Sequence, residues 1–207
     1  MTDFVYLASQ SPRRRQLLEQ WGVRCELLLP DETEDVEALE CVRGAEAPRV
    51  YVQRVTALKL QASVERLRRR GLPLAPVLCA DTTVALGRRI LGKPADAADA
   101  RRMLGDLSGQ RHRVLTAVAV ARPMARGAVR TWAALSTSEV EFDVWSAAQI
   151  RRYVASGEPM GKAGAYAIQG AAALNIRHIS GSYSGIMGLP AHETAQILRA
   201  VGVRLVC

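Results

Sequence analysis

The chain contains 207 residues, nearly half of them apolar, which is enough for one domain or two small lobes with a substantial core. It lacks an apolar run of about 18 residues and a signal-peptide pattern, so we expect a cytoplasmic protein with no membrane partner. The net charge of +8 favours an anionic partner, but aromatic residues are few and not interleaved with the basic clusters, which argues against a single-stranded nucleic-acid binder. The scattered cysteines and histidines show no metal-ligand spacing, so we expect free thiols and no structural zinc.

Residues 5–22 predict a short strand, a tight connection and a helix. Ser11 is a good N-cap, Pro12 suits the first helical position and Gly22 suits the stop. The backbone N–H groups at such a turn lie at the positive end of the helix dipole and favour an anion. Hydroxyl and guanidinium donors suited to phosphate oxygens lie beside them: Ser9, Ser11, Arg13 and Arg14. The alternative is a capped helix with surface arginines.

The next elements are separated by acidic and irregular segments. Residues 23–29 suggest a second strand, 30–35 an acidic loop and 41–48 a further loop. Residues 49–70 predict a long helix whose inward face is formed by Tyr51, Val55, Leu58 and Ala62. Acidic loops and basic helix faces are commonly solvated, which is the alternative to a functional role for either segment.

The stretch 77–94 is the strongest candidate for a site. Its apolar start, residues 77–80, has the composition of a strand buried on both faces, and Asp81 follows where the buried segment should emerge. Gly87 suits a hairpin turn that returns Lys93 to the end of the sheet that carries Asp81. Ligands of α/β folds gather at sheet ends, so an acid and a base there predict a site. The alternative is an ordinary buried strand with a salt bridge.

The remaining elements indicate the fold class. Asp96 caps a helix that ends before Gly109, Ser146 and Gln149 form a capping box, and Pro190 starts the last helix. Strands are predicted at 114–121 and 140–144, with a turn-rich connection at 122–130 and a segment of small residues at 160–188. Because strands and helices alternate early and strands adjoin later, we expect an α/β fold with a mixed, twisted sheet flanked by helices.

Separated motifs stand in order along the chain: Ser9–Arg14, Ala80–Thr82, Gly92–Pro94, Leu107–Gly109, Lys162–Gly170, Gly181–Tyr183 and Gly188–Pro190. Together they resemble the Maf family, known as septum formation inhibitor homologues and as nucleoside triphosphate pyrophosphatases. The resemblance runs from about Tyr6 to about Leu198 and implies a single Maf-like domain over residues 1–207. It also implies two lobes around a cleft, as in the related house-cleaning nucleotide pyrophosphatases.

The resemblance implies hydrolysis of a nucleoside triphosphate to the monophosphate and pyrophosphate. The residues that it assigns to substrate binding are Ser9, Arg13, Arg14, Lys59, Thr82, Lys93, Lys162 and Gln169. Glu34 and Asp81 would supply oxygen ligands for Mg²⁺, with Mn²⁺ as the alternative metal. Asp81 is also the expected proton acceptor that activates water, and the sequence leaves open whether it is base, metal ligand or both. Gly161 departs from the family pattern, which has an aspartate there.

Three positions point to the base of the nucleotide. Arg13, Thr82 and Gln169 resemble the family branch associated with dTTP and UTP, whereas the branch associated with 7-methyl-GTP commonly has Tyr, Gln and Glu there. A neutral amide suits the edge of uracil, while a carboxylate suits the positively charged N7-methylguanine. Pyrimidine triphosphates, canonical or modified, are therefore the expected substrates, and a homodimer is a family expectation without an interface signal in the sequence. The alternative function is a basic nucleic-acid-binding or septum-associated regulatory protein.

Overall fold

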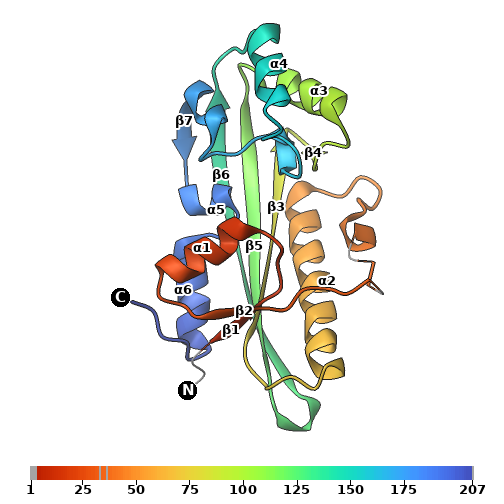
Figure 1. Cartoon of the computed structure of the whole chain (residues 1–207), viewed down its shortest axis with the longest axis vertical. Helices are drawn as coiled ribbons and strands as arrows, with labels where there is room; N and C mark the ends of the chain where they lie inside the picture. Colours follow the sequence, from red (N-terminus) through yellow and green to blue (C-terminus); the bar gives the residue numbers. More distant parts are fainter. Residues whose placement is uncertain (1–3, 33, 36, 207) are drawn as a thin grey trace.

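The computed structural model describes residues 4–32, 34–35 and 37–206 (Figure 1). Its strands are β1 (Val5–Leu7), β2 (Cys25–Leu27), β3 (Val77–Leu86), β4 (Arg89–Leu91), β5 (Arg111–Pro123), β6 (Val129–Phe142) and β7 (Ile176–Ser180). Its α-helices are α1 (Pro12–Gln20), α2 (Pro48–Arg69), α3 (Ala97–Leu107), α4 (Ala147–Ala155), α5 (Tyr183–Met187) and α6 (Ala191–Ala200). Short 3₁₀ turns are η1 (Glu37–Glu40), η2 (Ala125–Gly127), η3 (Ala163–Ala165) and η4 (Ala171–Asn175). No helix within these described ranges has the length and apolar character needed to cross a membrane.

The strands form one mixed sheet in the order β2-β1-β3-β5-β6-β7, with β4 paired to β3 off this path. β1 pairs in parallel with β2 and β3, whereas the pairings among β3, β4, β5, β6 and β7 are antiparallel. Helices flank the sheet, with α1 and α6 on one side and α2 on the other (Figure 1). The predicted α/β fold with a mixed sheet flanked by helices is therefore confirmed.

Strand β1 shows how the sheet supports both helical layers. Successive side chains of a strand point to opposite faces. Val5 and Leu7 accordingly pack in the cluster that contains α1 and α6 residues, whereas Tyr6 packs in the cluster that contains α2 residues. Residues 77–80 of β3 alternate between the same two clusters. Burial on both faces explains why this part of the sequence is an uninterrupted apolar run.

Strand β3 continues past Asp81, where the sequence suggested that the buried segment would end. Its parallel pairing with β1 reaches only Leu7 and Leu78, and its antiparallel pairing with β4 begins at Val84. Asp81 lies between the part of β3 that pairs with β1 and the part that pairs with β4. On its other side it lies opposite Ala117 of β5. The strand that ends near this point is β1, whereas β3 continues. The side chain of Asp81 therefore belongs to an unbroken strand.

The hairpin of β5 and β6 is longer than the sequence predicted. The strands pair from Arg111 with Glu141 to Pro123 with Val129, so only a short connection around η2 separates them. Residues 131–139 of β6 lack a hydrophobic alternation, because a run of apolar residues is followed by a run of polar ones that includes the buried Ser136 and Ser138. This part of the strand is therefore invisible to a pattern based on apolar residues.

A second core region surrounds α3 and α4, at the end of the hairpin opposite η2 (Figure 1). The side chain of Asp96 accepts a hydrogen bond from Asp99 N and caps α3, as predicted. The predicted capping box of Ser146 and Gln149 at α4 is also present. Val84 of β3 packs in this core region, whereas Ala80 packs with α1 and α6. Asp81 thus lies on β3 between two separately packed regions.

The inward face of α2 differs from the predicted stripe. Leu58 and Ala62 are only half-buried, and the fully covered positions instead include Val52, Thr56 and Leu60. The buried face is rotated relative to the prediction because polar Thr56 belongs to it. Lys59 consequently lies at the border of the buried face, and its side chain is only 15% exposed.

The cysteines within the described residues are free thiols, as expected. Cys41 is exposed, Cys25 is half-buried and Cys79 is buried. Burial raises the pKa of the Cys79 thiol to about 11, so this thiol is protonated near neutral pH. The prediction for Cys207 falls outside the described residues.

Candidate active site

A compact group of charges forms where α2, η1 and the loop after β4 meet β3. The ammonium of Lys59 lies 2.5 Å from an oxygen of Asp81 and 2.7 Å from Oε1 of Glu40. Lys93 donates to both carboxylate oxygens of Glu40, at 3.3 and 3.2 Å. Asp81 and Lys93, which the sequence placed at one end of a paired-strand unit, are thus joined through Lys59 and Glu40.

Burial makes these charges depend on one another. Burial lowers the pKa of Lys59, but attraction to Asp81 and Glu40 outweighs it, and the net shift is upward. Burial raises the pKa of Glu40, and Lys59 and Lys93 together reverse that shift. Removing one partner of such a buried group leaves an uncompensated charge, which typically costs about 3–5 kcal/mol. Lys59 and Glu40 therefore stabilise each other's charged forms.

The main chain that carries Glu40 is anchored to α2. Tyr51 donates its hydroxyl to the backbone oxygen of Glu40 at 2.8 Å. Arg54 donates to the backbone oxygen of Cys41 at 2.9 Å and forms two 2.8 Å hydrogen bonds with the carboxylate of Glu46. These contacts involve the backbone of Glu40 and Cys41 and the carboxylate of Glu46, and they leave the Glu40 carboxylate available for the lysines.

Arg14 of α1 organises the adjoining side of the site. Its Nε donates to the backbone oxygen of Gly188 at 2.8 Å, and its terminal nitrogens donate to Ser9 Oγ at 3.0 Å and Thr82 Oγ1 at 3.4 Å. The hydroxyl of Thr82 lies 3.0 Å from that of Thr116, which donates to the backbone oxygen of Gly185. Three of the predicted substrate residues, Ser9, Arg14 and Thr82, are therefore in direct contact.

Arg13 and Lys162 form a second pair of cations. Arg13 Nε donates to the backbone oxygen of Met187 at 3.3 Å, and the ammonium of Lys162 donates to the backbone oxygen of Glu158. Burial lowers the pKa of Lys162, and the positive charge of Arg13 lowers it further. An anion bound by both side chains would relieve this repulsion.

Gln169 lies on a loop whose shape is set by a neighbouring tyrosine and glutamate. Tyr153 donates to Glu158 Oε1 at 2.8 Å and accepts from Ala167 N at 3.3 Å, while Glu158 Oε2 accepts from Ala171 N at 3.1 Å. A Cβ on Gly170 would collide with the Glu158 carboxylate, so a larger residue there would displace this carboxylate from its partners. The Gln169 side chain is exposed, and it makes no hydrogen bond to any other residue in the described part of the chain.

The two predicted metal ligands, Asp81 and Glu34, form ion pairs with different residues. Asp81 belongs to the lysine cluster, whereas both oxygens of Glu34 are bound by Arg66, at 2.8 and 2.6 Å. Arg69 adds a 2.7 Å contact. The hydrogen bond from Arg66 is the main cause that lowers the pKa of Glu34 to about 2. Within the described residues, no group of three or more histidine, cysteine, aspartate or glutamate side chains has the geometry of a metal site.

Sequence reasoning missed Glu40, Thr116 and Glu158. Glu40 lies next to the segment predicted to be a loop, and no local pattern distinguishes it from the other acidic residues there. Thr116 is a buried hydroxyl inside the predicted core strand, and Glu158 lies in the turn after α4, between a glycine and a proline. Only the predicted proximity of residues 160–170 to the site could have singled out Glu158.

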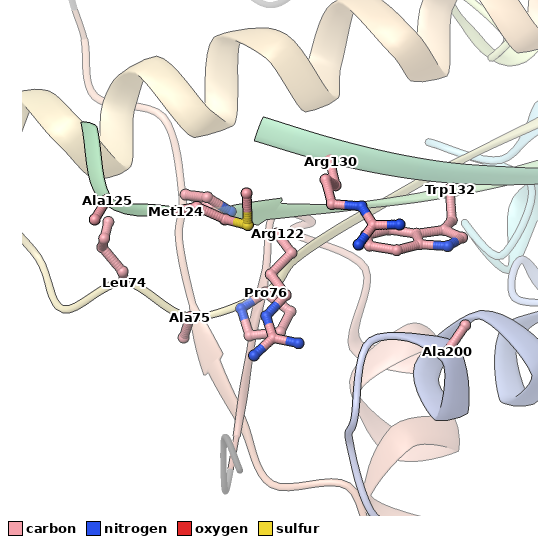
Figure 2. Close-up of a pocket in the computed structure, with 10 residues that line it drawn as sticks. Leu74, Ala75, Pro76, Arg122, Met124, Ala125, Arg130, Trp132 and Ala200 are labelled. Carbon is pink, nitrogen blue, oxygen red and sulfur yellow. The ribbon is translucent and has the colours of Figure 1, made fainter. Parts of the chain in front are cut away.

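Two hollows on the surface lie apart from these residues. Figure 2 shows one of about 400 Å³, lined mainly by the ends of β5 and β6, in which the guanidinium of Arg130 lies 5.3 Å from the ring centroid of Trp132. The other, of about 460 Å³, runs between α2 and the alanine-rich parts of β5 and β6. Neither is lined by a predicted site residue, so the candidate site is defined by convergent charge and not by hollow size.

Known proteins resemble this chain over nearly its whole length. A protein from Polaromonas sp. strain JS666, described as dTTP/UTP pyrophosphatase, is 66% identical over 203 residues, which cover 98% of each chain. A protein of the same description from Albidiferax ferrireducens is 63% identical and covers 99% of this chain and 100% of its own. The solved structure of a HAM1 protein from Coxiella burnetii matches 68% of this chain and 73% of its own, with 13% identity and a TM-score of 0.42.

The family comparison covers the candidate site from end to end. The model described as Maf-like protein matches residues 4–201, a range that contains β1 and every charged residue described above. This chain therefore belongs to the Maf-like protein family.

Proposed function

We propose that this protein hydrolyses dTTP and UTP to the nucleoside monophosphate and pyrophosphate. The observation that carries the proposal is the convergence of Lys59 and Lys93 on one carboxylate beside Asp81, with Arg13 and Arg14 on the adjoining side. Such a set of cations around one acid suits a triphosphate and a reacting water. The pyrimidine preference is supported by the description dTTP/UTP pyrophosphatase that relatives at 66% and 63% identity carry.

The cations supply the main part of the chemistry. Water adds to phosphorus, the bond between the α- and β-phosphates breaks, and negative charge grows on the departing pyrophosphate. Lys59, Lys93 and Arg13 would hold that charge, because fixed cations in a partly dry site stabilise developing charge without reorganising. Arg14 positions Ser9 and Thr82 along the same surface. The proton of the attacking water passes to Asp81, which Lys59 orients at 2.5 Å.

A divalent cation, Mg²⁺ or Mn²⁺, fits the oxygen chemistry of this site. Mg²⁺ commonly binds through one or two carboxylates and the phosphates of its substrate, so a complete protein cage is unnecessary. Asp81 would be one ligand. Glu34 could be the second only after leaving Arg66, which now binds both its oxygens. When bound, the cation would neutralise part of the triphosphate charge.

The loop of Gln169 is the proposed reader of the base. Tyr153 and Glu158 hold the loop on both sides of Gln169, and the neutral amide is exposed for an N–H and a carbonyl of a pyrimidine edge. Lys162 shares the same support, because its ammonium donates to the backbone of Glu158. Base recognition and phosphate binding would thus be connected through one short segment.

Pyrophosphate release from a panel of canonical and modified nucleoside triphosphates with Mg²⁺ tests the proposal. dTTP and UTP should be the best canonical substrates, and a preference for 7-methyl-GTP over both would contradict it. Filter binding with DNA and RNA across a salt series tests the nucleic-acid alternative, because purely electrostatic binding falls steeply as salt rises. We also propose a single cytoplasmic domain acting as a homodimer, for which light scattering in solution gives the oligomeric state.

A further inference from the structure

We propose that Glu40 is an internal competitor for the phosphate site: its carboxylate occupies the position between Lys59 and Lys93 that a phosphate group takes when substrate binds. The inference rests on the proposed function for the identity of the substrate. It assigns to Glu40 a role in setting how tightly anions are held, above all the pyrophosphate product and free inorganic phosphate.

The contacts of Glu40 resemble those of a bound oxyanion. Oε1 accepts from Lys59 at 2.7 Å and from Lys93 at 3.3 Å, and Oε2 accepts from Lys93 at 3.2 Å. The two oxygens of the Glu40 carboxylate therefore bridge the ammonium groups of Lys59 and Lys93, and a phosphate group could bridge them in the same way. Asp81 contacts Lys59 separately, so the carboxylate of Glu40 can leave without removing the only counter-charge of Lys59.

The position of Glu40 is built into the fold and is not an incidental surface pairing. The hydroxyl of Tyr51, a residue that is only 7% exposed, binds the Glu40 backbone oxygen, and Arg54 binds those of Leu39 and Cys41. The side chain is therefore presented from an anchored main chain. The side chain of Lys59 is 15% exposed and that of Lys93 is 55% exposed, so the Glu40 carboxylate is held mainly by the more buried Lys59.

A competitor of this kind weakens the binding of every anion that contacts both Lys59 and Lys93. The apparent dissociation constant equals the intrinsic constant divided by the fraction of molecules in which Glu40 has moved away. A triphosphate still binds despite this loss of affinity, because it would also contact Arg13 and Arg14. Inorganic phosphate has no such further contacts, and pyrophosphate has fewer once the nucleoside has left. Glu40 would therefore keep the lysines clear of simple phosphates and speed release of pyrophosphate.

Titration calorimetry of inorganic phosphate and of pyrophosphate against the whole chain, without metal, tests the inference directly. In Glu40→Gln the neutral amide has nearly the same shape and the anchoring backbone is unchanged. Both anions should bind about tenfold more tightly to this variant, equivalent to about 1.4 kcal/mol. The matched control is Glu65→Gln, which removes one negative charge from an exposed position on α2 whose carboxylate accepts a hydrogen bond from Gln61. It should leave both affinities unchanged.

Several outcomes would overturn the inference. Unchanged or weaker anion binding in Glu40→Gln would mean that Glu40 organises the lysines or holds the metal and does not compete. Equal tightening in Glu65→Gln would reduce the effect to overall charge. If Glu40→Gln failed to fold, Glu40→Asp, with its shorter arm, should still tighten binding about twofold to threefold, and no change there would count against the inference. Because wild-type hydrolysis is assayed separately, absence of turnover with the expected anion shift would refute only the proposed function.

Discussion

Arg14 Nε donates a 2.8 Å hydrogen bond to the backbone oxygen of Gly188, which lies 174 residues further along the chain. The same guanidinium reaches Ser9 and Thr82, so one side chain joins the turn after β1, the middle of β3 and the end of α5. Arg14 is therefore expected to support the shape of the site as much as to contact substrate.

Arg14→Lys should lower both stability and activity. A lysine cannot donate to Gly188, Ser9 and Thr82 at once, because its ammonium lacks the planar fork of a guanidinium. We expect a loss of about 1.5–3 kcal/mol in the free energy of unfolding, measured by denaturant titration, together with reduced turnover. Arg15→Lys, at an exposed position that forms an ion pair with Glu19, is the control and should change neither. Equal stability of the two variants would show that the three contacts of Arg14 contribute little.

Asp81→Asn should abolish most of the turnover while the fold remains. The amide keeps the size of the carboxylate but can neither accept a proton nor bind a metal strongly, so the rate should fall at least ~10²-fold. Steady-state pyrophosphate release gives the rate, and thermal unfolding checks the fold. Near-normal turnover in a folded variant would rule out Asp81 as either base or metal ligand.

Arg13→Ala and Lys93→Ala should each reduce kcat/KM by a factor that corresponds to roughly 1.5–3 kcal/mol, the range for charge-assisted hydrogen bonds to phosphate. Arg151→Ala on the exposed face of α4 removes the same charge outside the site and should have little effect. Should all three variants lose the same amount, the protein would be attracting nucleotides only through its overall positive charge.

Gln169→Glu should lower activity with dTTP and UTP, because a carboxylate would face a carbonyl of the pyrimidine edge. The change alone should not create activity with 7-methyl-GTP, since Arg13 and Thr82 remain. The measurement is kcat/KM for the three nucleotides in both proteins. Unchanged pyrimidine activity would place base recognition elsewhere.

The buried His112 should make stability depend on pH. Burial lowers its pKa from an ordinary value of 6.5 to about 4, so between these pH values the unfolded chain binds a proton that the folded chain does not. Stability should therefore fall as pH decreases from about 6.5 to about 4, by up to about 1.4 kcal/mol per pH unit. His112→Gln should flatten this part of the profile, measured by denaturant titration, whereas His178→Gln, at an exposed position, should leave it unchanged. An identical slope in His112→Gln would contradict the prediction.

Local chemistry explains the parts of the fold that could be predicted from the sequence. The cap at Asp96, the capping box of Ser146 and Gln149, and the apolar run 77–80 each depend on neighbouring residues, and each was found as expected. Residues 131–139 of β6 were missed because their apolar and polar residues do not alternate. The predicted face of α2 was right at Tyr51 and Val55 and wrong at Leu58 and Ala62. Thr56 is buried instead, with its hydroxyl donating to the backbone oxygen of Val52.

Residues of the candidate site could be predicted from the sequence only where they belong to a motif that resembles the family. Ser9, Arg14 and Thr82 lie in contact, and Lys59 joins Asp81, but neither contact follows from spacing along the chain. Glu40 could not be selected from its acidic surroundings, because its importance arises from lysines on two other segments. The roles of these residues remain predictions that the experiments above address.

The continuation of β3 past the end of β1 places the reacting carboxylate and the residues around it on different kinds of element. Asp81 is held in the interior of a ten-residue strand, so shifting its backbone would break pairing with β5. Glu40 and Gln169 are carried instead by a short turn and a loop. Substitutions in those segments can retune anion affinity or base preference while the reacting carboxylate stays in place. Apart from the side chain of Thr82 on β3, the positions that change with substrate among relatives should therefore lie outside this strand.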